Sequence, residues 1–196
     1  MDIYYKDCPH MVQGWGWQAD TRTHLLRMVA SGVFDRYPNL KVIIGHLGEL
    51  IPFGLDRINK QLTMVNWLLG SRPEEAGAVT RMEKNLLYYM RNNVFITSSC
   101  VFDEVALNCA IERMGIDNVM FSIDDPFSDN IEGVEFLKNA NLSQADREKF
   151  SHGNAECILK LSTAVHPSKS TSSAFDAFQA RAKSWVARAL LSFLVK

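Results

Sequence analysis

The sequence contains no hydrophobic run approaching the roughly 18 residues that mark a candidate membrane-spanning helix. Its polar N-terminus also lacks the pattern of a signal peptide. Charge of neither sign predominates, because 21 Lys and Arg residues stand against 22 Asp and Glu residues. A nucleic-acid-binding protein would show a basic excess. We therefore expect no membrane span and no nucleic-acid partner.

Cysteine is scarce and its spacing is wide. The four cysteines form no Cys-x-x-Cys pair and lie far apart, at Cys8, Cys100, Cys109 and Cys157. That spacing argues against a zinc-finger-type site. We interpret the four side chains as reduced thiols, which are typical of a cytoplasmic protein.

The length allows one domain with a substantial core but is short for one common architecture. At 196 residues, the chain falls below the roughly 250 residues of a complete eight-stranded α/β barrel. A barrel assignment therefore predicts that only part of the barrel is represented here.

The most informative stretch is Lys41-Val-Ile-Ile-Gly-His-Leu-Gly-Glu49. Its short apolar run predicts a strand buried on both faces, as in a parallel sheet. Gly45 and Gly48 permit a sharp turn, so His46 and Glu49 can point to where the loops after the strands converge on an α/β active site. The alternative is an ordinary strand-to-helix turn with a structural histidine, because His-x-x-Glu alone is a weak pattern.

Two further strands are expected, at 93–99 and 118–124. The second ends in Asp124-Asp125-Pro126. An acid directly after a buried strand is costly unless it binds a metal, a proton or a cation, so Asp124 is a candidate functional residue. Asp125 would point the opposite way and is expected to face solvent or cap a helix.

Helical spacing of apolar residues predicts helices between these strands. The first follows a cap at Asp20 or Thr21, after an irregular loop over residues 1–19. The others are expected near 51–69, 74–91, 102–114, 131–139 and 143–161, and Ser143-x-x-Asp146 resembles a capping box. This alternation predicts a parallel sheet, although periodicity does not separate a piece of barrel from an open doubly wound sheet.

Several side chains have both a structural and a functional interpretation. His24 is expected to be a buried, hydrogen-bonded structural residue, and His152 a surface or capping residue. Trp15 and Trp17 either pack or line a ligand pocket. Arg57, on the helix after the first strand, is either simply exposed or reaches an anionic group.

The C-terminal part has a different composition. Residues 164–173 are rich in Ser and are predicted to form a linker. Residues 174–196 are predicted to form an amphipathic helix that covers exposed core or a partner, or that lies on a membrane surface. Residues 1–163 then form the main domain.

Four spaced motifs carry a specific resemblance: 23–57 with its GHLGE core, NVFITSS, VMFSIDDPF and 153–161. Together they resemble the metal-dependent decarboxylases of the amidohydrolase superfamily, and within it the o-hydroxybenzoate decarboxylases such as 2,3-dihydroxybenzoate and γ-resorcylate decarboxylase. The resemblance implies the C-terminal portion of a (β/α)8 barrel, about three strands with their helices. It covers roughly residues 20–161.

The resemblance also implies roles for particular residues. His46 and Glu49 match the catalytic pair of the GHxGE motif, and Asp124 matches the aspartate that is a metal ligand and candidate proton donor. Arg57 matches the following arginine and is a candidate substrate-binding residue. The implied activity is nonoxidative decarboxylation of a small aromatic acid with a divalent ion (Zn, Mn or Mg) and no organic cofactor.

Other parts of the family pattern are missing from the sequence. No Glu-x-His or Glu-x-Ala strand precedes Thr23, and no strand ends in the family's middle-strand histidine; His10 is a poor replacement because its context is a loop. One carboxylate does not retain a catalytic metal alone. The alternatives are a truncated, inactive chain that acts by association with a full-length relative or as a homo-oligomer, and a hydrolase of the same superfamily.

Overall fold

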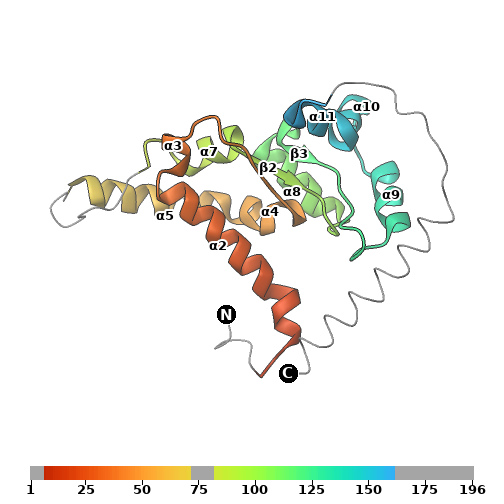
Figure 1. The fold of residues 1–196 in the computed structure, drawn as a ribbon, viewed down its shortest axis with the longest axis horizontal. Coiled ribbons are helices and arrows are strands. Elements are labelled where there is room, and N and C mark those ends of the chain that lie inside the picture. Colours follow the sequence, from red (N-terminus) through yellow and green to blue (C-terminus); the bar gives the residue numbers. More distant parts are fainter. Residues whose placement is uncertain (1–6, 72–81, 162–196) are drawn as a thin grey trace.

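The computed structural model describes residues 7–71 and 82–161, and its centre is a parallel three-stranded sheet (Figure 1). The strands are β1 (Val42–Ile44), β2 (Val94–Thr97) and β3 (Val119–Met120), in the order β1-β2-β3. Ile44 pairs with Ile96, and Ile96 pairs with Val119. Because the strands are parallel, the residues that follow them emerge at the same edge of the sheet.

Helices precede and follow the strands, which confirms the predicted alternation. Before β1 lie a π-helix η1 (Val12–Gly16), α2 (Trp17–Ala30) and α3 (Val33–Arg36). Between β1 and β2 lie the short turn α4 (His46–Glu49), α5 (Ile51–Ser71) and α7 (Leu86–Asn92). Between β2 and β3 lie α8 (Glu104–Met114) and a 3-10 turn η2 (Ile116–Asn118). The remaining elements are α9 (Asn130–Asn139), α10 (Gln144–Glu148), a π-helix η3 (Lys149–Gly153) and α11 (Asn154–Leu159).

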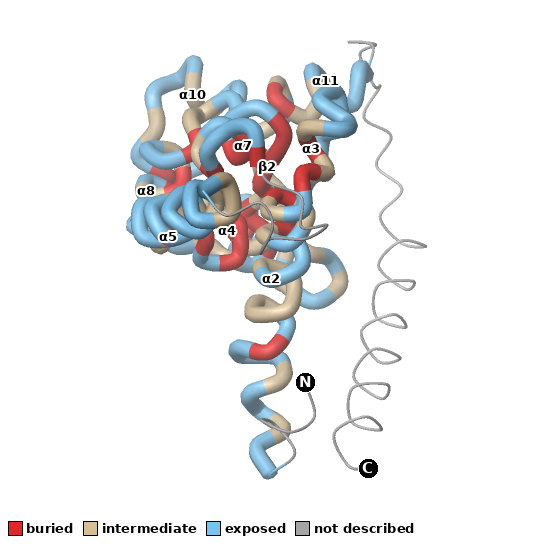
Figure 2. The backbone as a smooth tube through the Cα atoms, turned by 90° about the vertical axis from the view of Figure 1, so that its left-hand side faces the viewer, coloured by how far each residue is buried: buried red, intermediate tan, exposed pale blue. Residues whose placement is uncertain are grey.

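The core lies around β2, where the buried segments gather in Figure 2. Val94 and Ile96 are fully buried, and Leu107 and Met114 of α8 pack in the same cluster. Phe150 of η3 closes the side near β3, where its carbonyl accepts a hydrogen bond from the Phe121 N–H at 2.7 Å. Apolar residues at helical spacing therefore form the predicted core-facing sides of these elements.

The predicted loop over residues 1–19 is wrong for the part that is described, because helical structure begins by Val12. Asp20 and Thr21 lie inside α2 and do not cap it. Burial of Gly16 outweighs its low helix propensity here, and Arg22 lies over the Trp15 ring at 5.6 Å. Residues 1–6 lie outside the described residues.

Three burial predictions also need correction. His24 is exposed, because Leu25 and Val29 form the core-facing side of α2. The first strand is not buried on both faces: Ile43 is 43% exposed at an edge of the described sheet. The helical spacing of apolar residues over 102–114 also predicts a buried Val105, but this side chain of α8 is 78% exposed.

The third strand is shorter than predicted because side chains replace its backbone ladder. After Met120 the Ser122 N–H donates to Ser98 Oγ at 2.9 Å, and Ser98 Oγ donates to the Ser122 carbonyl at 2.6 Å. The chain therefore still runs beside the end of β2 as far as Ile123, whose carbonyl accepts from the Cys100 N–H at 3.1 Å.

Other expectations agree with the structure. Ser143 caps α10, with its Oγ accepting from the Asp146 N–H at 3.1 Å, and the Ser143 hydroxyl also donates to the Asp146 carboxylate at 2.8 Å. His152 is exposed beside Glu156. Among the described residues, no helix is long and apolar enough to cross a membrane. The linker 164–173, the C-terminal helix 174–196 and residues 74–81 of the excursion at 74–91 lie outside the described residues.

Candidate active site at the ends of the three strands

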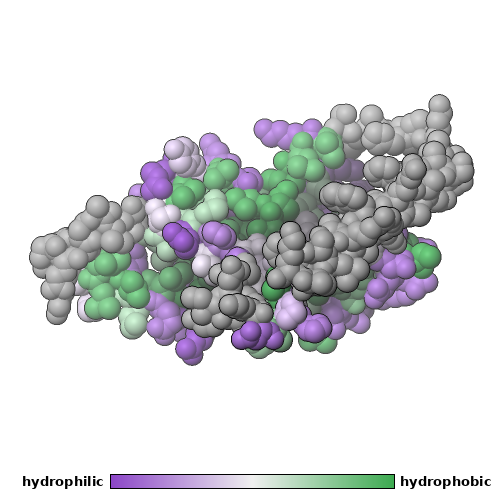
Figure 3. All heavy atoms as spheres, turned by 60° about the horizontal axis from the view of Figure 1, so that its bottom comes forward, coloured by the Kyte–Doolittle hydropathy of each residue, from purple (hydrophilic) through white to green (hydrophobic). Residues whose placement is uncertain are grey.

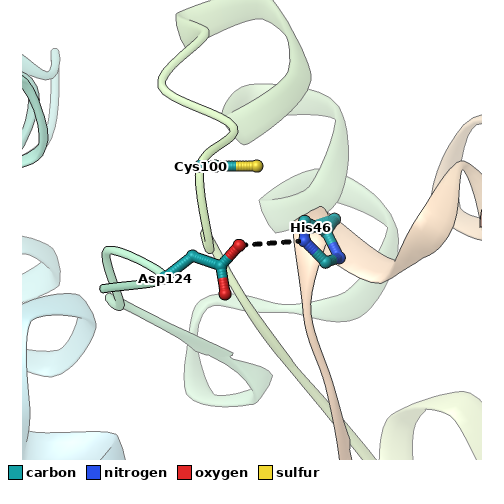
Figure 4. Close-up of side chains that lie close together, drawn as sticks. All are labelled: His46, Cys100 and Asp124. Atoms are coloured by element: carbon teal, nitrogen blue, oxygen red, sulfur yellow. Dashed lines mark ion pairs between the residues drawn. The ribbon is translucent and has the colours of Figure 1, made fainter. Parts of the chain in front are cut away.

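The three chain segments that leave the strands bring His46, Cys100 and Asp124 together (Figure 4). His46 follows β1, Cys100 lies three residues after β2, and Asp124 lies four residues after β3. One ligand atom from each side chain lies within 4.8 Å of the other two. His46 and Asp124, two candidate residues from the sequence, therefore lie close together, and a thiol lies beside them.

A left-handed turn positions His46 and Glu49. Backbone φ is positive at every residue from His46 to Leu50, including 52° at His46 and 80° at Gly48. Left-handed conformation costs an L-residue roughly 1–2 kcal/mol, so the surrounding structure must hold this turn in place. Such strain is concentrated at functional sites, which motivates a functional interpretation of the turn.

The two glycines of the turn have different reasons to be glycine. Gly48 needs its positive φ, and a Cβ there would lie 3.1 Å from Pro52 Cδ. Gly45 is extended, a conformation any residue adopts, with φ −79° and ψ −172°. Its lack of a side chain instead allows Ser99 to approach, since a Cβ would lie 3.2 Å from Ser99 Oγ.

Glu49 orients His46. Glu49 is buried, and its Oε1 lies 2.7 Å from His46 Nδ1. With the Nδ1–H donating to this carboxylate, His46 Nε2 is directed to the other side, where Asp124 Oδ2 lies 3.6 Å away. The hydrogen bond to Glu49 raises the pKa of His46, and the charge of Asp124 adds to this effect against the opposing effect of partial burial.

Hydroxyl groups hold the segment after β2. Ser99 Oγ lies 2.8 Å from Thr97 Oγ1 and 2.7 Å from Ser122 Oγ. Ser99 and Cys100 both have positive φ, at 31° and 53°. This network fixes the left-handed backbone that places Cys100 beside Asp124.

The Cys100 thiol faces the same carboxylates as His46. Desolvation raises its pKa, as do the charges of Asp124 and Glu49, while a hydrogen bond with Ser128 works in the opposite direction. Negative charge therefore accumulates on this side of the site, which favours a cation there.

Two adjoining cavities meet at the site and share Gln18, His46 and Glu49. One is about 480 Å³ and is also lined by Gln13, Trp17, Cys100, Asp124, Phe127 and Ser128. The other is about 390 Å³ and is lined mainly by apolar side chains from two chain segments, 47–53 and 101–109. The first combines aromatic side chains with the titratable residues, which is typical of a small-molecule site.

Not all of the candidate residues lie at this site. Arg57 is exposed on α5 and lines neither cavity. His10 is exposed and does not belong to the metal-type cluster among the described residues. Asp125 is exposed, as expected, and accepts a hydrogen bond from Asn130 at 3.3 Å. Of the two tryptophans, Trp17 lines the larger cavity, whereas Trp15 stacks with Arg22.

Cys100 is not among the site residues predicted from the sequence. The spacing of the cysteines from one another carries no information on a site that combines His, Cys and Asp. A useful signal was nevertheless present, because Cys100 follows the strand that we expected between the two strands leading to His46 and Asp124.

A parallel sheet with site residues at the ends of its strands defines part of an α/β barrel of the metal-dependent hydrolase type. The amidohydrolase family model matches residues 6–161, and the chain belongs to that family. The predicted resemblance and the fold class are therefore confirmed for this part of the chain.

Relatives and solved structures agree on one class of enzyme. The γ-resorcylate decarboxylase of Polaromonas sp. is 33% identical over 147 residues, covering 75% of this chain and 42% of the relative. The crystal structure of 5-carboxyvanillate decarboxylase from Sphingomonas paucimobilis has a TM-score of 0.71 at 31% identity, covering 83% of this chain and 46% of that one. A 5-carboxyvanillate decarboxylase from Novosphingobium aromaticivorans, complexed with manganese and 4-hydroxy-3-methoxy-5-nitrobenzoic acid, has a TM-score of 0.67 at 32% identity, covering 74% and 40% of the two chains.

The match is partial on the side of the relatives. The chain spans less than half the length of the curated relatives it matches. The activity of those longer proteins therefore passes to this chain only as a proposal.

Proposed function

We propose that this chain carries out nonoxidative, metal-dependent decarboxylation of a small hydroxylated aromatic acid of the o-hydroxybenzoate type. The observation that carries the proposal is His46 held between Glu49, at 2.7 Å, and Asp124, at 3.6 Å, on the wall of a cavity with aromatic side chains. The decarboxylase activity of the relatives supports the same reaction class.

The residues present suit a divalent cation. Asp124 offers a carboxylate to the cavity, and Glu49 Oε2 is buried without a hydrogen-bond partner among the described residues. Carboxylate oxygens are appropriate donors for such an ion. Asp124 would hold the ion, which when bound supplies orientation and polarisation of the substrate's carboxylate and ortho-hydroxyl. The choice among Zn, Mn and Mg belongs to this proposal.

The chain's own residues account for substrate placement. Trp17 and Phe127 line the larger cavity, where their rings offer flat apolar surfaces to an aromatic acid. The apolar cavity beside it accommodates ring substituents that point away from Asp124. The reactive carbon would then lie near His46 Nε2.

Proton delivery is assigned to His46. In the imidazolium form, Nδ1–H donates to Glu49 while Nε2–H faces the cavity, and the raised pKa of His46 favours this form. The ring carbon that bears the carboxylate takes the proton, the bond to the carboxylate carbon breaks, and its electron pair returns to the ring as CO2 leaves. Asp124 as the proton donor is the competing assignment.

The experiment is a decarboxylation assay of the purified 196-residue chain, with Mn²⁺, on a panel of hydroxybenzoates that includes 2,6-dihydroxybenzoate and 5-carboxyvanillate. We expect CO2 release that His46→Asn lowers about 100- to 10,000-fold. Asp125→Asn is the control and should leave the rate unchanged. A role of Arg57 in substrate binding predicts a raised KM in Arg57→Ala.

Hydrolysis of a lactone or amide without CO2 release would favour the superfamily's other chemistry. No CO2 release by the metal-loaded, folded chain would contradict independent catalysis. Association with a longer relative or a second copy stays a prediction in either case.

A further inference from the structure

We propose that Cys100 is a metal ligand, and that His46, Cys100 and Asp124 together bind a zinc ion. The inference goes beyond the proposed function, although it uses two of the same residues. It adds a thiolate ligand from the middle strand of the sheet.

Cys100 follows the strand that lies between the strands leading to His46 and Asp124. β2 lies between β1 and β3, so the segment after β2 emerges between the segments that carry His46 and Asp124. The Cys100 N–H is fixed to the Ile123 carbonyl at 3.1 Å, and the residue is held at a positive φ of 53°. A cysteine keeps such a left-handed conformation only where the surrounding structure holds it in place. Conformations of this kind are concentrated at functional sites, which favours a functional role for Cys100.

The distances between the three ligand atoms suit a tetrahedral ion. Ligand atoms at about 2.0–2.3 Å from a tetrahedral ion lie about 3.3–3.6 Å from one another. His46 Nε2 and Asp124 Oδ2 are 3.6 Å apart, and the three ligand atoms all lie within 4.8 Å. Small side-chain rotations therefore suffice to place all three around one ion, and the larger cavity leaves room for a fourth ligand such as water or a substrate oxygen.

Glu49 gives His46 the second hydrogen-bond partner that a metal-binding histidine usually has. Metal-binding histidines usually donate their second ring N–H to a carboxylate, which fixes the tautomer and directs the other nitrogen at the ion. Glu49 lies 2.7 Å from His46 Nδ1 and is almost fully buried, at 3% exposure. Its second oxygen, Oε2, is buried without a hydrogen-bond partner among the described residues, and Glu49 lines both cavities. The buried Glu49 carboxylate therefore supplies the outer-shell partner that directs His46 Nε2 towards the ion.

The donor set selects the ion. Manganese and magnesium prefer oxygen ligands, whereas thiolate with imidazole and a carboxylate is typical of zinc. A structural neighbour of this chain is complexed with manganese. Cys100 therefore predicts that this chain binds zinc more tightly than manganese.

Zinc binding has a consequence for the proposed reaction. His46 Nε2 has one lone pair, so an imidazole that binds zinc through it does not deliver a proton from the same atom. We expect zinc to inhibit a manganese-supported reaction of the wild-type chain, and to inhibit it much less in Cys100→Ser.

The test uses Co²⁺ as a spectroscopic probe of the full 196-residue chain under reducing, oxygen-free conditions. Coordination of a thiolate gives a sulfur-to-cobalt charge-transfer absorption in the near ultraviolet. We expect this absorption in the wild type, its displacement by Zn²⁺, and its loss in Cys100→Ser. Cys157→Ser is the matched control, because Cys157 is an exposed free thiol on α11, and it should keep the absorption.

A second measurement needs no variant. Zn²⁺ should slow alkylation of Cys100, because a thiolate bound to zinc is no longer a free nucleophile, while Cys157 reacts at its original rate. Peptide mass spectrometry distinguishes the two thiols. No charge-transfer absorption in the wild type, its retention in Cys100→Ser, or unprotected Cys100 in the presence of zinc would each overturn the proposal. These results do not depend on CO2 release, so they separate failure of the metal site from failure of the proposed reaction.

Discussion

Glu49 contacts His46 on the side away from Asp124 and Cys100. Its carboxylate determines which nitrogen of His46 faces Asp124. The hydrogen bond to Glu49 also gives the largest contribution to the raised pKa of His46. Glu49 is therefore a positioning residue, and its effect should be visible in the histidine itself.

Glu49→Gln keeps the volume of the side chain but removes its charge. We expect the pKa of His46 to fall, because the stabilising partner of the imidazolium is lost, and CO2 release to fall about 10- to 100-fold. An NMR pH titration of the His46 ring in chelator-treated protein measures the first effect. Glu156→Gln alters the exposed His152–Glu156 pair and is the control. An unchanged His46 titration in Glu49→Gln would contradict this role.

Gly48 is required by the left-handed turn that carries Glu49. An alanine there would take a strained φ of 80° and place its Cβ 3.1 Å from Pro52 and 3.2 Å from Ile96. We expect Gly48→Ala to lower the free energy of unfolding by roughly 1–3 kcal/mol, measured by urea denaturation.

Gly54→Ala, in the helix α5, is the matched control for that substitution. Its Cβ would meet only Ile58 Cδ1, at 3.4 Å, and an alanine in a helix is favoured over glycine by roughly 0.5–1 kcal/mol. Equal stability changes in the two variants would refute the assignment of strain to Gly48.

At the scale of elements, side chains replace strand pairing between the end of β2 and the chain after β3. Ser98 is fully buried and makes two hydrogen bonds to the Ser122 backbone. Ser98→Ala leaves the Ser122 N–H and the Ser122 carbonyl without the Ser98 hydroxyl as their partner. We therefore expect a loss of about 1–3 kcal/mol in the free energy of unfolding. Ser31→Ala, at an exposed serine with a longer 3.3 Å bond to Met28, should change it by less than about 0.5 kcal/mol. A neutral Ser98→Ala would show that this contact does not support the site.

The same elements explain what the sequence could and could not predict. His46 and Asp124 were identifiable because each follows a short apolar run, and Glu49 because of its spacing from His46. The left-handed turn was not predictable, since five consecutive positive φ values have no local sequence pattern and depend on packing around Leu47 and Ile51. The early start of helical structure was missed for the same reason: burial of Gly16 outweighs its propensity.

At the scale of the whole molecule, the described part is a fragment of a barrel with considerable apolar surface. Hydrophobic residues reach the surface on the face shown in Figure 3. Phe53, Trp67 and Val105 are among the most exposed apolar side chains of the described residues. Exposed apolar surface of this kind indicates association with further protein, so homo-oligomerisation or docking on a longer relative stays a prediction.

One polar contact links distant parts of this fold. The Tyr89 hydroxyl of α7 donates to Asp35 of α3 and accepts from the Lys84 N–H at 2.9 Å. Burial, followed by the hydrogen bond to Asp35, raises the pKa of Tyr89 from 10.0 to about 12. This interaction is fully present below pH 10 and is lost as the pH rises through about 12.

Tyr89→Phe should therefore lower the free energy of unfolding by about 1–3 kcal/mol at neutral pH. Its difference from the wild type should shrink between pH 10 and 12, as followed by denaturant unfolding across that range. Tyr88→Phe is the control, because Tyr88 is adjacent but 47% exposed. A difference that stays constant to pH 12 would contradict the assigned contact.

The central claim is that this chain protonates an aromatic ring carbon and releases CO2 at the site formed by His46, Glu49 and Asp124. The most direct measurement is mass spectrometry and NMR of the product formed from 2,6-dihydroxybenzoate by the manganese-loaded chain in D2O. We expect a product with one deuterium on the carbon that carried the carboxylate, and no such product from Asp124→Asn. Unchanged substrate, or product that forms equally well in Asp124→Asn, would contradict it.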